Sequence, residues 1–577
     1  MKISLYLGVS LSSVAVGVSL AAGPAMAQLH PEQSISPLAG TRAQAPEPRT
    51  PEVFELPVSP EVPLSSLRKG NEGPSFNLSH IKVSEKTPKG LKPILTEAEI
   101  ETIVSPYRNR SVTLGEVALL RDLLTQKVIA KGYITSGAEI ENLDIAAGAL
   151  KLELVRGQLT SVVAKDYGYL SSQYITARFT GKTGSAIKAD DLQSQYQLLL
   201  EDRNIAALNA VLKPGDRRGE AILEIDSLKL KPRHELTVFV ASDRSPSVGA
   251  TRAGMRGRTA SLMSTGDELS GEIGQTEGMT DARLNYSVPL RSNGLQFNLF
   301  VQGSKADIIE EPLNALDAAS SSFYYGGGLS VPLIRKPTRN LILNTTVDRL
   351  RVKTELLGVP FSFSPGAVDG VTEYSTARSH LVYAAYGRRQ SVVAGLSVTR
   401  GLSAQNGTRD IDVHFTRLNA SIEYLRVLTV TDQRLILRAQ VQQTSDRLFS
   451  TEMLSIGGTD TVRGFRQNSL IGPKGYTASV EYQIPASDII KTKLPRNHPF
   501  SPSRMRVGLF ADTGHVDPLP GAAGATRENL SAVGARLIWS PTEHVLVAGH
   551  VAKRLGNGVA TGNYQDEGFG FNLSYRF

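Results

Sequence analysis

From about residue 234 to the last residue, apolar and polar side chains alternate in short stretches of the chain. Alternation at a period of two residues is typical of a β-strand whose two faces meet different surroundings. One stretch sets Leu435, Leu437, Ala439 and Val441 against Arg434, Arg438, Gln440 and Gln442. Repeated arginines on one face exclude a dry core, because an unpaired buried charge costs several kcal/mol. The pattern therefore predicts a wet interior and an apolar exterior.

About sixteen stretches of this kind follow one another between residues 234 and 577, separated by Gly, Ser, Asp, Asn and Pro. A closed barrel leaves no strand edge unpaired, and its apolar outer face suits the hydrocarbon of a membrane. The alternation therefore predicts a transmembrane antiparallel β-barrel of about 16 strands over residues 234–577.

The connections between these candidate strands fall into two kinds. If the first strand runs outward, every even strand returns to the periplasmic side, where turns are short. Proline suits a strand end because it cannot donate to the ladder. Prolines stand at the predicted ends of strands four, six, twelve and fourteen, namely Pro289, Pro332, Pro485 and Pro541. The long insertions follow odd strands, near residues 304–320, 354–374, 401–412 and 446–475. Trp539, the single tryptophan, lies where an interfacial aromatic belt is expected.

The amino terminus has the pattern of an exported protein. Lys2 precedes a long apolar stretch, and Ala25-Met26-Ala27 supplies a cleavage site, so we expect a signal peptide over residues 1–27. An uncleaved membrane anchor is the alternative interpretation. Residues 28–72 are rich in Pro, Ser, Glu and Ala without apolar periodicity, which predicts a linker or an N-terminal arm.

Two small units of mixed helix and strand are predicted between this arm and the barrel, over residues 73–158 and 159–233. In the first unit, Val117, Leu120, Leu124 and Val128 repeat at helical spacing within residues 114–130. The second unit repeats the plan, with Leu192, Tyr196 and Leu199 along one helix. Each unit has the size of a small α+β module.

Other functional classes find little support in the sequence. The net charge of +8 is not gathered into basic runs, so nucleic-acid binding is not expected. The sequence GKTGS at 181–185 has Thr176 where a phosphate-binding loop needs glycine, and we interpret it as a turn. There is no cysteine, no serine nucleophile elbow and no metal-binding helix motif, and we interpret His515 as structural. We therefore expect no enzyme activity, no cofactor and no metal site.

The last strand completes a known layout. Residues 567–577 alternate apolar and polar side chains and end with Tyr575, Arg576 and Phe577. A signal peptide, small modules and a barrel ending in phenylalanine resemble the POTRA-barrel outer-membrane proteins. The resemblance implies that the two modules are POTRA domains in the periplasm. It also implies that Tyr575 and Phe577 belong to the C-terminal signal read by the barrel-assembly machinery.

The loop before strand twelve narrows the resemblance. The sequence SIGGTDTVRGFRQNSLIGPKGYTASVEYQIP closely resembles the sixth-loop signature of the two-partner secretion transporters, the TpsB family of haemolysin and haemagglutinin exporters. The loop residues that carry it are Gly457, Gly458, Val462, Arg463, Gly464 and Phe465, with Glu481 on the following strand. The sequence GLFADTGHV resembles the family's next strand motif and carries over Phe510, Asp512 and Gly514. The module sequences fit as well, so the resemblance covers nearly all of the mature chain.

The same residues form a consistent site on physical grounds. Alternation places Asp512 and Glu481 on the lumen side of their strands. Gly464 allows a tight turn, and Phe465 supplies an apolar contact at the tip. We therefore expect the loop 446–475 to fold into the lumen and to bring Arg463 against Asp512 as a charge-assisted pair.

The resemblance implies an outer-membrane transporter, with no enzyme activity, that captures a large exported polypeptide by its N-terminal secretion domain and moves it through the barrel to the cell surface. A POTRA-barrel insertase, which would assemble other outer-membrane barrels, is the alternative. The small number of modules and their sequences favour the transporter. Relatives carry an N-terminal plug helix, but the prolines of residues 28–72 argue against one here, apart from a short segment such as Leu64–Arg68.

Overall fold

The computed structural model describes residues 74–577 except 88–91, 180–183, 185, 218, 312, 405–410, 492–493, 496, 518–527 and 557–561. The signal peptide and the arm predicted for residues 1–72, with the segment Leu64–Arg68, lie outside the described residues, as does most of the sequence GKTGS. The described residues divide near residue 233 into a modular unit and a barrel unit. Among the described residues, no helix has the length and apolar character needed to cross a membrane.

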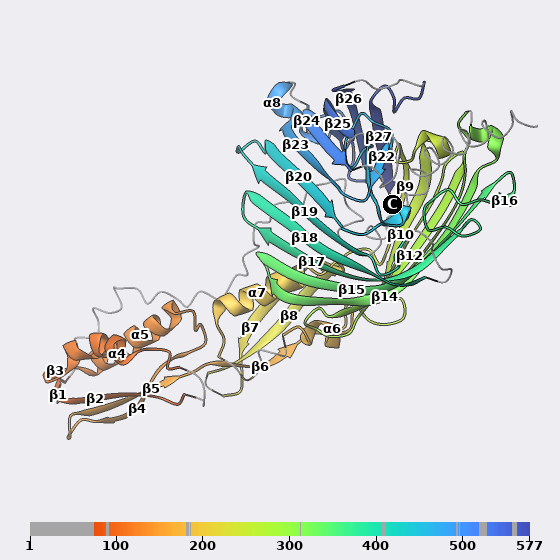
Figure 1. Cartoon of the computed structure of the whole chain (residues 1–577). Coiled ribbons are helices and arrows are strands. Elements are labelled where there is room, and N and C mark those ends of the chain that lie inside the picture. Colours follow the sequence, from red (N-terminus) through yellow and green to blue (C-terminus); the bar gives the residue numbers. More distant parts are fainter. Residues whose placement is uncertain are drawn as a thin grey trace, which may run out of the picture. The chain divides into compact units, whose positions relative to one another are not determined.

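The first module packs two helices against short sheets (Figure 1). Its elements are β1 (Phe76–Leu78), β2 (His80–Glu85), α4 (Glu97–Val104), η3 (Ser105–Tyr107), β3 (Arg110–Val112), α5 (Leu114–Ala130), β4 (Gly137–Asp144) and β5 (Ala149–Val155). The helix predicted over 114–130 is confirmed, and its four-residue apolar stripe is fully buried. Strand β5 lies between β2, to which it is parallel, and β4, to which it is antiparallel.

Capping boxes fix the start of both helices of this module. Thr113 accepts from the backbone N–H of Glu116, and the Glu116 carboxylate accepts from the backbone N–H of Thr113. Thr96 and Glu99 make the same reciprocal pair at α4. A hydrogen bond from Lys131, together with the N–H of Thr96, lowers the pKa of Glu99 to about 2.

The second module repeats this plan with β6 (Gln158–Val163), α6 (Ser172–Thr176), α7 (Ala189–Leu200), β7 (Ile205–Pro214) and β8 (Glu220–Leu230). Strand β8 lies between the parallel β6 and the antiparallel β7. The predicted stripe of Leu192, Tyr196 and Leu199 is buried, and the Tyr196 hydroxyl donates to the carbonyl of Leu208 at 2.5 Å. Each module therefore has its own core and a three-stranded sheet with two edge strands.

The barrel unit is a closed antiparallel barrel of 16 long strands, as the alternation predicted. The strands are β9 (His234–Ala241), β10 (Arg252–Ala260), β11 (Glu268–Gln275), β12 (Met279–Pro289), β13 (Gln296–Asp307), β14 (Ala319–Lys336), β15 (Arg339–Leu356), β17 (Val371–Tyr386), β18 (Gln390–Ala404), β19 (Thr416–Val427), β20 (Arg434–Gln443), β23 (Gly475–Pro485), β24 (Met505–Val516), β25 (Glu528–Trp539), β26 (Val545–Arg554) and β27 (Phe569–Arg576). The two-residue β16 (Val359–Pro360) extends the pairing of β15. Pairing of β27 with β9 closes the wall.

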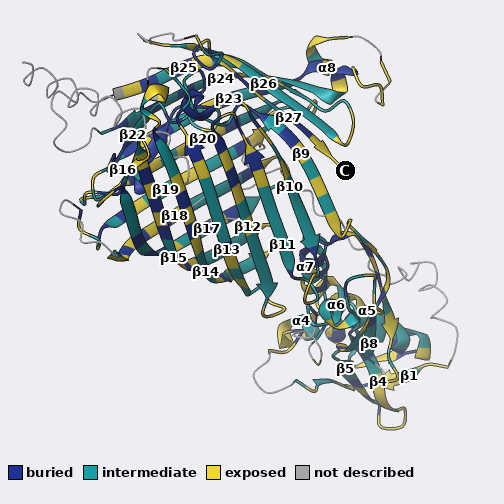
Figure 2. Cartoon of the chain, turned by 90° about the vertical axis from the view of Figure 1, so that its right-hand side faces the viewer, coloured by how far each residue is buried: buried dark blue, intermediate teal, exposed yellow. Residues whose placement is uncertain are grey.

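Burial alternates along the strands and separates an outer from an inner face (Figure 2). On β24 the outward Leu509 is exposed, whereas its neighbour Phe510 and the carboxylate residue Asp512 are buried inside the barrel. The same alternation sets outward Leu437 against inward Arg438 on β20. The inner face is therefore the polar one, in agreement with the sequence pattern.

One predicted strand end is wrong. Pro289 and Pro485 end β12 and β23, and Pro541 follows β25, but β14 continues past Pro332 to Lys336. The pairing of β14 with β15 shifts register between Pro332 and Ile334. A bulge accommodates the missing N–H of proline inside a strand, so the strand need not end there.

The seam between β9 and β27 provides a test of the barrel register. Val238 lies opposite Tyr575, and both side chains are exposed on the outer face. Because the chain has no cysteine, Val238→Cys with Tyr575→Cys introduces one possible disulfide. We expect oxidation to cross-link this pair in the folded barrel, as shown by gel migration and peptide mass. The diagonal pair Val238→Cys with Leu573→Cys is the matched control, since diagonal neighbours lie about 7–8 Å apart. Preferential cross-linking of the control pair would contradict the register.

Candidate functional site

The connection between β20 and β23, residues 444–474, lies inside the barrel. It contains η7 (Ser450–Glu452), β21 (Leu454–Ile456) and β22 (Leu470–Gly472), and β21 and β22 pair with each other as an antiparallel ladder. Between these strands the chain turns at Gly457, Gly458 and Gly464, which have φ values of +105°, +95° and +90°. Positive φ favours glycine, so these positions explain the glycines of the loop motif.

Arg463 at the tip of this loop is joined to Asp512 on β24 by three hydrogen bonds. Its Nε donates to Oδ2 at 2.7 Å, its Nη2 donates to Oδ1 at 2.8 Å, and its backbone N–H donates to Oδ2 at 3.0 Å. Two parallel guanidinium bonds to one carboxylate are the strongest common arrangement of such a pair. The structure thus places Arg463 against Asp512 in a bidentate pair.

Other residues of the wall complete the surroundings of the Arg463 guanidinium. Its Nη1 donates to Glu481 Oε2 at 2.6 Å, and its Nη2 donates to Ser479 Oγ at 3.2 Å. Its Cζ lies 3.4 Å from the ring centroid of Phe510, a close cation–π contact. We name this group of contacts, Arg463 with Asp512, Glu481, Ser479 and Phe510, the Arg463 anchor.

Apolar and small residues fit the loop tip to the wall. Val462 is fully buried in one cluster with Ile456 and Phe510. A Cβ added to Gly514 would lie 3.0 Å from Val462 Cγ2, so the absence of a side chain there makes room for the tip. A Cβ on Gly464 would lie 2.8 Å from that of Ala552 on β26. The motif positions therefore favour glycine because neighbouring atoms approach closely as well as because of the backbone φ angle.

Phe465 and the following Arg466 make further contacts with the barrel. Phe465 lies under the Arg554 guanidinium, whose carbon is 5.1 Å from the ring centroid. Arg466 donates to both oxygens of Asp566 at 2.7 Å and also to Glu310 Oε2 at 3.0 Å. These contacts tie the tip to the connections that follow β13 and β26.

The base of the loop has a second charged centre that the sequence analysis did not find. Glu452 is fully buried, and its carboxylate accepts from Arg378 Nη2 at 2.6 Å and from the Tyr374 hydroxyl at 2.9 Å. Arg417 Nη1 lies 3.2 Å from the same carboxylate, and Arg378 also donates to Asp348 at 2.9 Å. We name Glu452 with Arg378, Arg417 and Tyr374 the Glu452 anchor.

A sequence signal for this second centre exists. Arg378 on β17 and Arg417 on β19 occupy inward positions, and their charges require partners in the lumen. The long loop is the segment that reaches them, and Glu452 is the acidic residue near its start. Matching inward arginines to loop carboxylates would have pointed to it.

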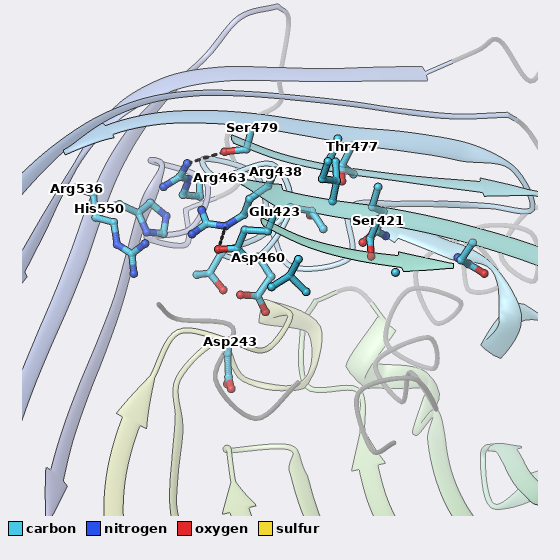
Figure 3. A pocket seen from close by; sticks show the side chains of 18 of the residues that line it. Asp243, Ser421, Glu423, Arg438, Asp460, Arg463, Thr477, Ser479, Arg536 and His550 are labelled. Atoms are coloured by element: carbon cyan, nitrogen blue, oxygen red, sulfur yellow. Dashed lines mark hydrogen bonds and ion pairs between the residues drawn. The ribbon is translucent and has the colours of Figure 1, made fainter. Parts of the chain in front are cut away.

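A cavity of about 410 Å³ lies beside the Arg463 anchor, inside the barrel (Figure 3). Its wall carries Arg438, Arg536, Asp460 and Glu423 together with Arg463 itself. The remaining lining is dominated by small and polar side chains from β18, β19, β20 and β23, among them Ser397, Ser421, Gln440, Thr477 and Ser479. Such polar and charged groups make the surface wettable.

The other predicted residues lie apart from this site. Tyr575 and Phe577 form an exposed aromatic pair at the rim, with ring centroids 4.8 Å apart. His515 has polar partners in Asn529 at 2.8 Å and Asp517 at 3.1 Å. Within the described residues, no group of His, Asp and Glu is arranged to hold a metal ion.

Family comparisons match both parts of the chain. A family model described as haemolysin secretion/activation protein ShlB/FhaC/HecB matches residues 229–536, and a model of the ShlB-type POTRA domain matches residues 76–157. The outer membrane transporter CdiB of Escherichia coli O6:K15:H31 (strain 536 / UPEC) is 26% identical over 451 residues, which cover 72% of this chain and 70% of the relative. The heme/hemopexin transporter protein HuxB of Haemophilus influenzae (strain 86-028NP) is 21% identical over 505 residues, covering 84% of each chain.

Solved structures show the same fold. CdiB from Escherichia coli has a TM-score of 0.64 at 18% identity, with 97% of this chain and 98% of that chain covered. BamA from Haemophilus ducreyi lacking POTRA domains 1–3 has a TM-score of 0.52 at 12% identity, with 87% and 100% covered. At these identities the likeness concerns the fold, so the choice between transporter and insertase rests on the family matches. Because its matching model spans more than half of the sequence, the chain belongs to the ShlB/FhaC/HecB family of haemolysin secretion/activation proteins, the outer-membrane transporters of two-partner secretion.

Proposed function

We propose that this transporter captures one large exported polypeptide in the periplasm and passes it through the barrel, and that residues 444–474 are the part that moves. The observation that carries this proposal is that the loop filling the lumen is held to the wall by charged and polar contacts at its tip and its base. In a hydrated lumen these charged groups can exchange their partners for water, while the apolar loop residues, such as Phe449 and Val462, must also leave their clusters. A loop held in this way is suited to release and return.

The position of the cavity supports movement of the loop tip away from the wall. Arg463 forms part of the cavity wall, so withdrawal of the tip would enlarge the space beside it. The lining combines small and polar side chains with charges of both signs, so it presents a hydrated surface and not one shaped to a single side chain. An extended polypeptide of varied sequence needs a passage of that kind.

The wall residues differ in what they lose when Arg463 leaves. Glu481 has two further arginines close by, with Arg536 Nη1 at 3.8 Å and Arg438 Nη1 at 3.9 Å. Asp512 is held by Arg463 and by the Ser479 hydroxyl, which donates at 2.7 Å. Release of the loop therefore costs most at Asp512, and we propose that this carboxylate draws the tip back.

The modules support the capture step. Their edge strands are β2 and β4 in the first module and β6 and β7 in the second. An extended segment can add a strand to such an edge, where backbone hydrogen bonds give affinity and alternate side chains give specificity. We propose that the N-terminal secretion domain of the partner binds there.

The barrel also has partners of its own in this proposal. The exposed pair Tyr575 and Phe577 on the last strand supports recognition of the unfolded barrel by the assembly machinery. The outward apolar residues, such as Leu437, Leu509 and Leu537, support contact with outer-membrane lipid.

The Arg463 anchor is tested by Arg463→Ala, Asp512→Ala and the double variant. Each single change removes about 1–3 kcal/mol of anchoring and shifts the equilibrium between anchored and released loop by about 5- to 150-fold. We expect normal membrane insertion, secretion of the partner reduced about tenfold or more, and altered channel conductance. Because the two residues act as a pair, the double variant should cost less than the sum of the singles.

The matched control for these variants is Arg258→Ala. Arg258 makes a lumenal ion pair with Glu268 at 2.7 Å and does not take part in either anchor. We expect near wild-type secretion from this control. Wild-type secretion by Arg463→Ala, or fully additive losses in the double variant, would contradict a paired function of the anchor.

The Glu452 anchor is tested by Glu452→Gln, which keeps the shape of the side chain and removes its charge. Two buried guanidiniums then lose their shared carboxylate, and we expect a loss of about 3 kcal/mol in local stability. The measurements are the temperature of heat-modifiable gel migration and the rate of proteolysis within 444–474. Glu373→Gln is the control, because Glu373 pairs with the partly exposed Arg349. Equal behaviour of the two variants would show that Glu452 does not hold the loop.

A further inference from the structure

One connection on the periplasmic side of the barrel is unlike the others. If β9 is counted as the first strand of the barrel, every second strand ends at the rim where β9 begins. Most of the turns that follow these strands are short, as at 337–338, 387–389 and 540–544. The connection between β23 and β24 occupies residues 486–504 and contains α8 (Ala486–Ile489) and η8 (Pro502–Arg504). Periplasmic turns of such barrels are normally short, so the length of this connection needs an explanation.

The middle of this connection exposes large apolar side chains. Ile489 is 57% exposed, Ile490 is 47% exposed and Phe500 is 59% exposed, whereas Ala486 and Pro502 at the two ends are buried. A concentration of exposed apolar side chains in one segment indicates a surface that contacts a membrane or another molecule.

Its later half lies on the outer wall of the barrel. Trp539 shares the outward face of β25 with Val533 and Leu537. Phe500 stacks on Trp539 with ring centroids 5.1 Å apart and planes at 26°. The Trp539 indole N–H donates to the carbonyl of Pro499 at 2.9 Å. The connection therefore folds back onto the face of the barrel that meets the membrane.

Its earlier half is joined to the neighbouring periplasmic turn, residues 428–433. Asp488 accepts from the Thr431 hydroxyl at 2.7 Å and from Gln433 Nε2 at 2.8 Å. Gln433 in turn accepts from the hydroxyl of Tyr482, an aromatic residue on the outer face of β23. This second turn exposes Val430 by 88%. The two turns thus form one surface around Tyr482 and Trp539, which we name the rim segment.

We propose that the rim segment, the described residues 428–433 with 486–491, 494–495 and 497–504, inserts into the periplasmic leaflet of the outer membrane and binds phospholipid at the boundary of headgroups and acyl chains. The proposed surface continues the outward apolar face of the barrel, where Val480 on β23 and Leu537 on β25 are exposed. Tyrosine and tryptophan are the side chains that favour this depth. Exposed Lys491 supplies a cation beside the apolar residues, as in interfacial membrane-binding segments.

Because of its position, the rim segment also affects the wall of the lumen. It joins the periplasmic ends of β23 and β24, the strands that carry Glu481 and Asp512. Insertion of this segment in lipid fixes the depth of those two strands in the membrane, and with it the wall that holds the loop tip.

The absence of native cysteine allows a direct test with the full-length protein. Ile489→Cys and, as the matched control at the same rim, Glu543→Cys in the exposed connection after β25 are each labelled with an environment-sensitive fluorophore. The proteins are reconstituted in phosphatidylethanolamine and phosphatidylglycerol vesicles that contain lipids with a nitroxide near the headgroup. We expect quenching at residue 489 to be at least about threefold stronger than at residue 543.

A second variant keeps the test independent of labelling. Phe500→Ser in the cysteine-free chain should leave the barrel folded and shift the emission of Trp539, the only tryptophan, to longer wavelength in vesicles. Equal nitroxide quenching at residues 489 and 543 would overturn the proposal. Protection of residue 489 from aqueous iodide without nitroxide quenching would also overturn it, because a protein surface would then cover the segment.

Discussion

The structure of the barrel interior depends on pairing the charges that line it. Arg463 reaches Asp512 and Glu481 from a loop, and Glu452 reaches Arg378 and Arg417 from the base of the same loop. Each of these groups would be costly to bury without a partner, so the loop and the wall satisfy each other. The loop that fills the lumen is held both by matched charges and by apolar contacts with the wall, to which Phe449 and Val462 contribute. A closure of this kind is compatible with opening, since the partners can be replaced by water.

The two anchors have different surroundings, and this difference suggests different roles. The Glu452 anchor is supported by a stacked pair of rings, Tyr374 and Phe449, at 4.2 Å and by hydrogen bonds from Gln442 to the backbone of the loop. The Arg463 anchor borders the cavity, and two further arginines, Arg536 and Arg438, lie 3.8 and 3.9 Å from its Glu481 carboxylate. The tip is thus the end of the loop with an adjoining space to move into.

Much of this architecture follows from the sequence, for identifiable reasons. The barrel was predictable because a period of two residues with arginines on one face admits few other folds, and the helix over 114–130 because its stripe repeats at helical spacing. The contact of Arg463 with Asp512 followed from strand alternation and from the family motif. Glu452 was missed because an irregular loop has no period from which the direction of a side chain can be read. Pro332 was misplaced because the bulge that accommodates it depends on the register of its partner strand β15.

A reversible cross-link shows directly whether the tip of residues 444–474 must leave the wall during transport. Val462→Cys with Gly514→Cys joins the tip to β24, where a Cβ at residue 514 would lie 3.0 Å from Val462 Cγ2. The chain has no other cysteine, so reductant alone releases the tip. If the tip must move, oxidised cells stop secreting the partner, and reductant restores secretion in the same cells. Continued secretion by the fully cross-linked protein would contradict it.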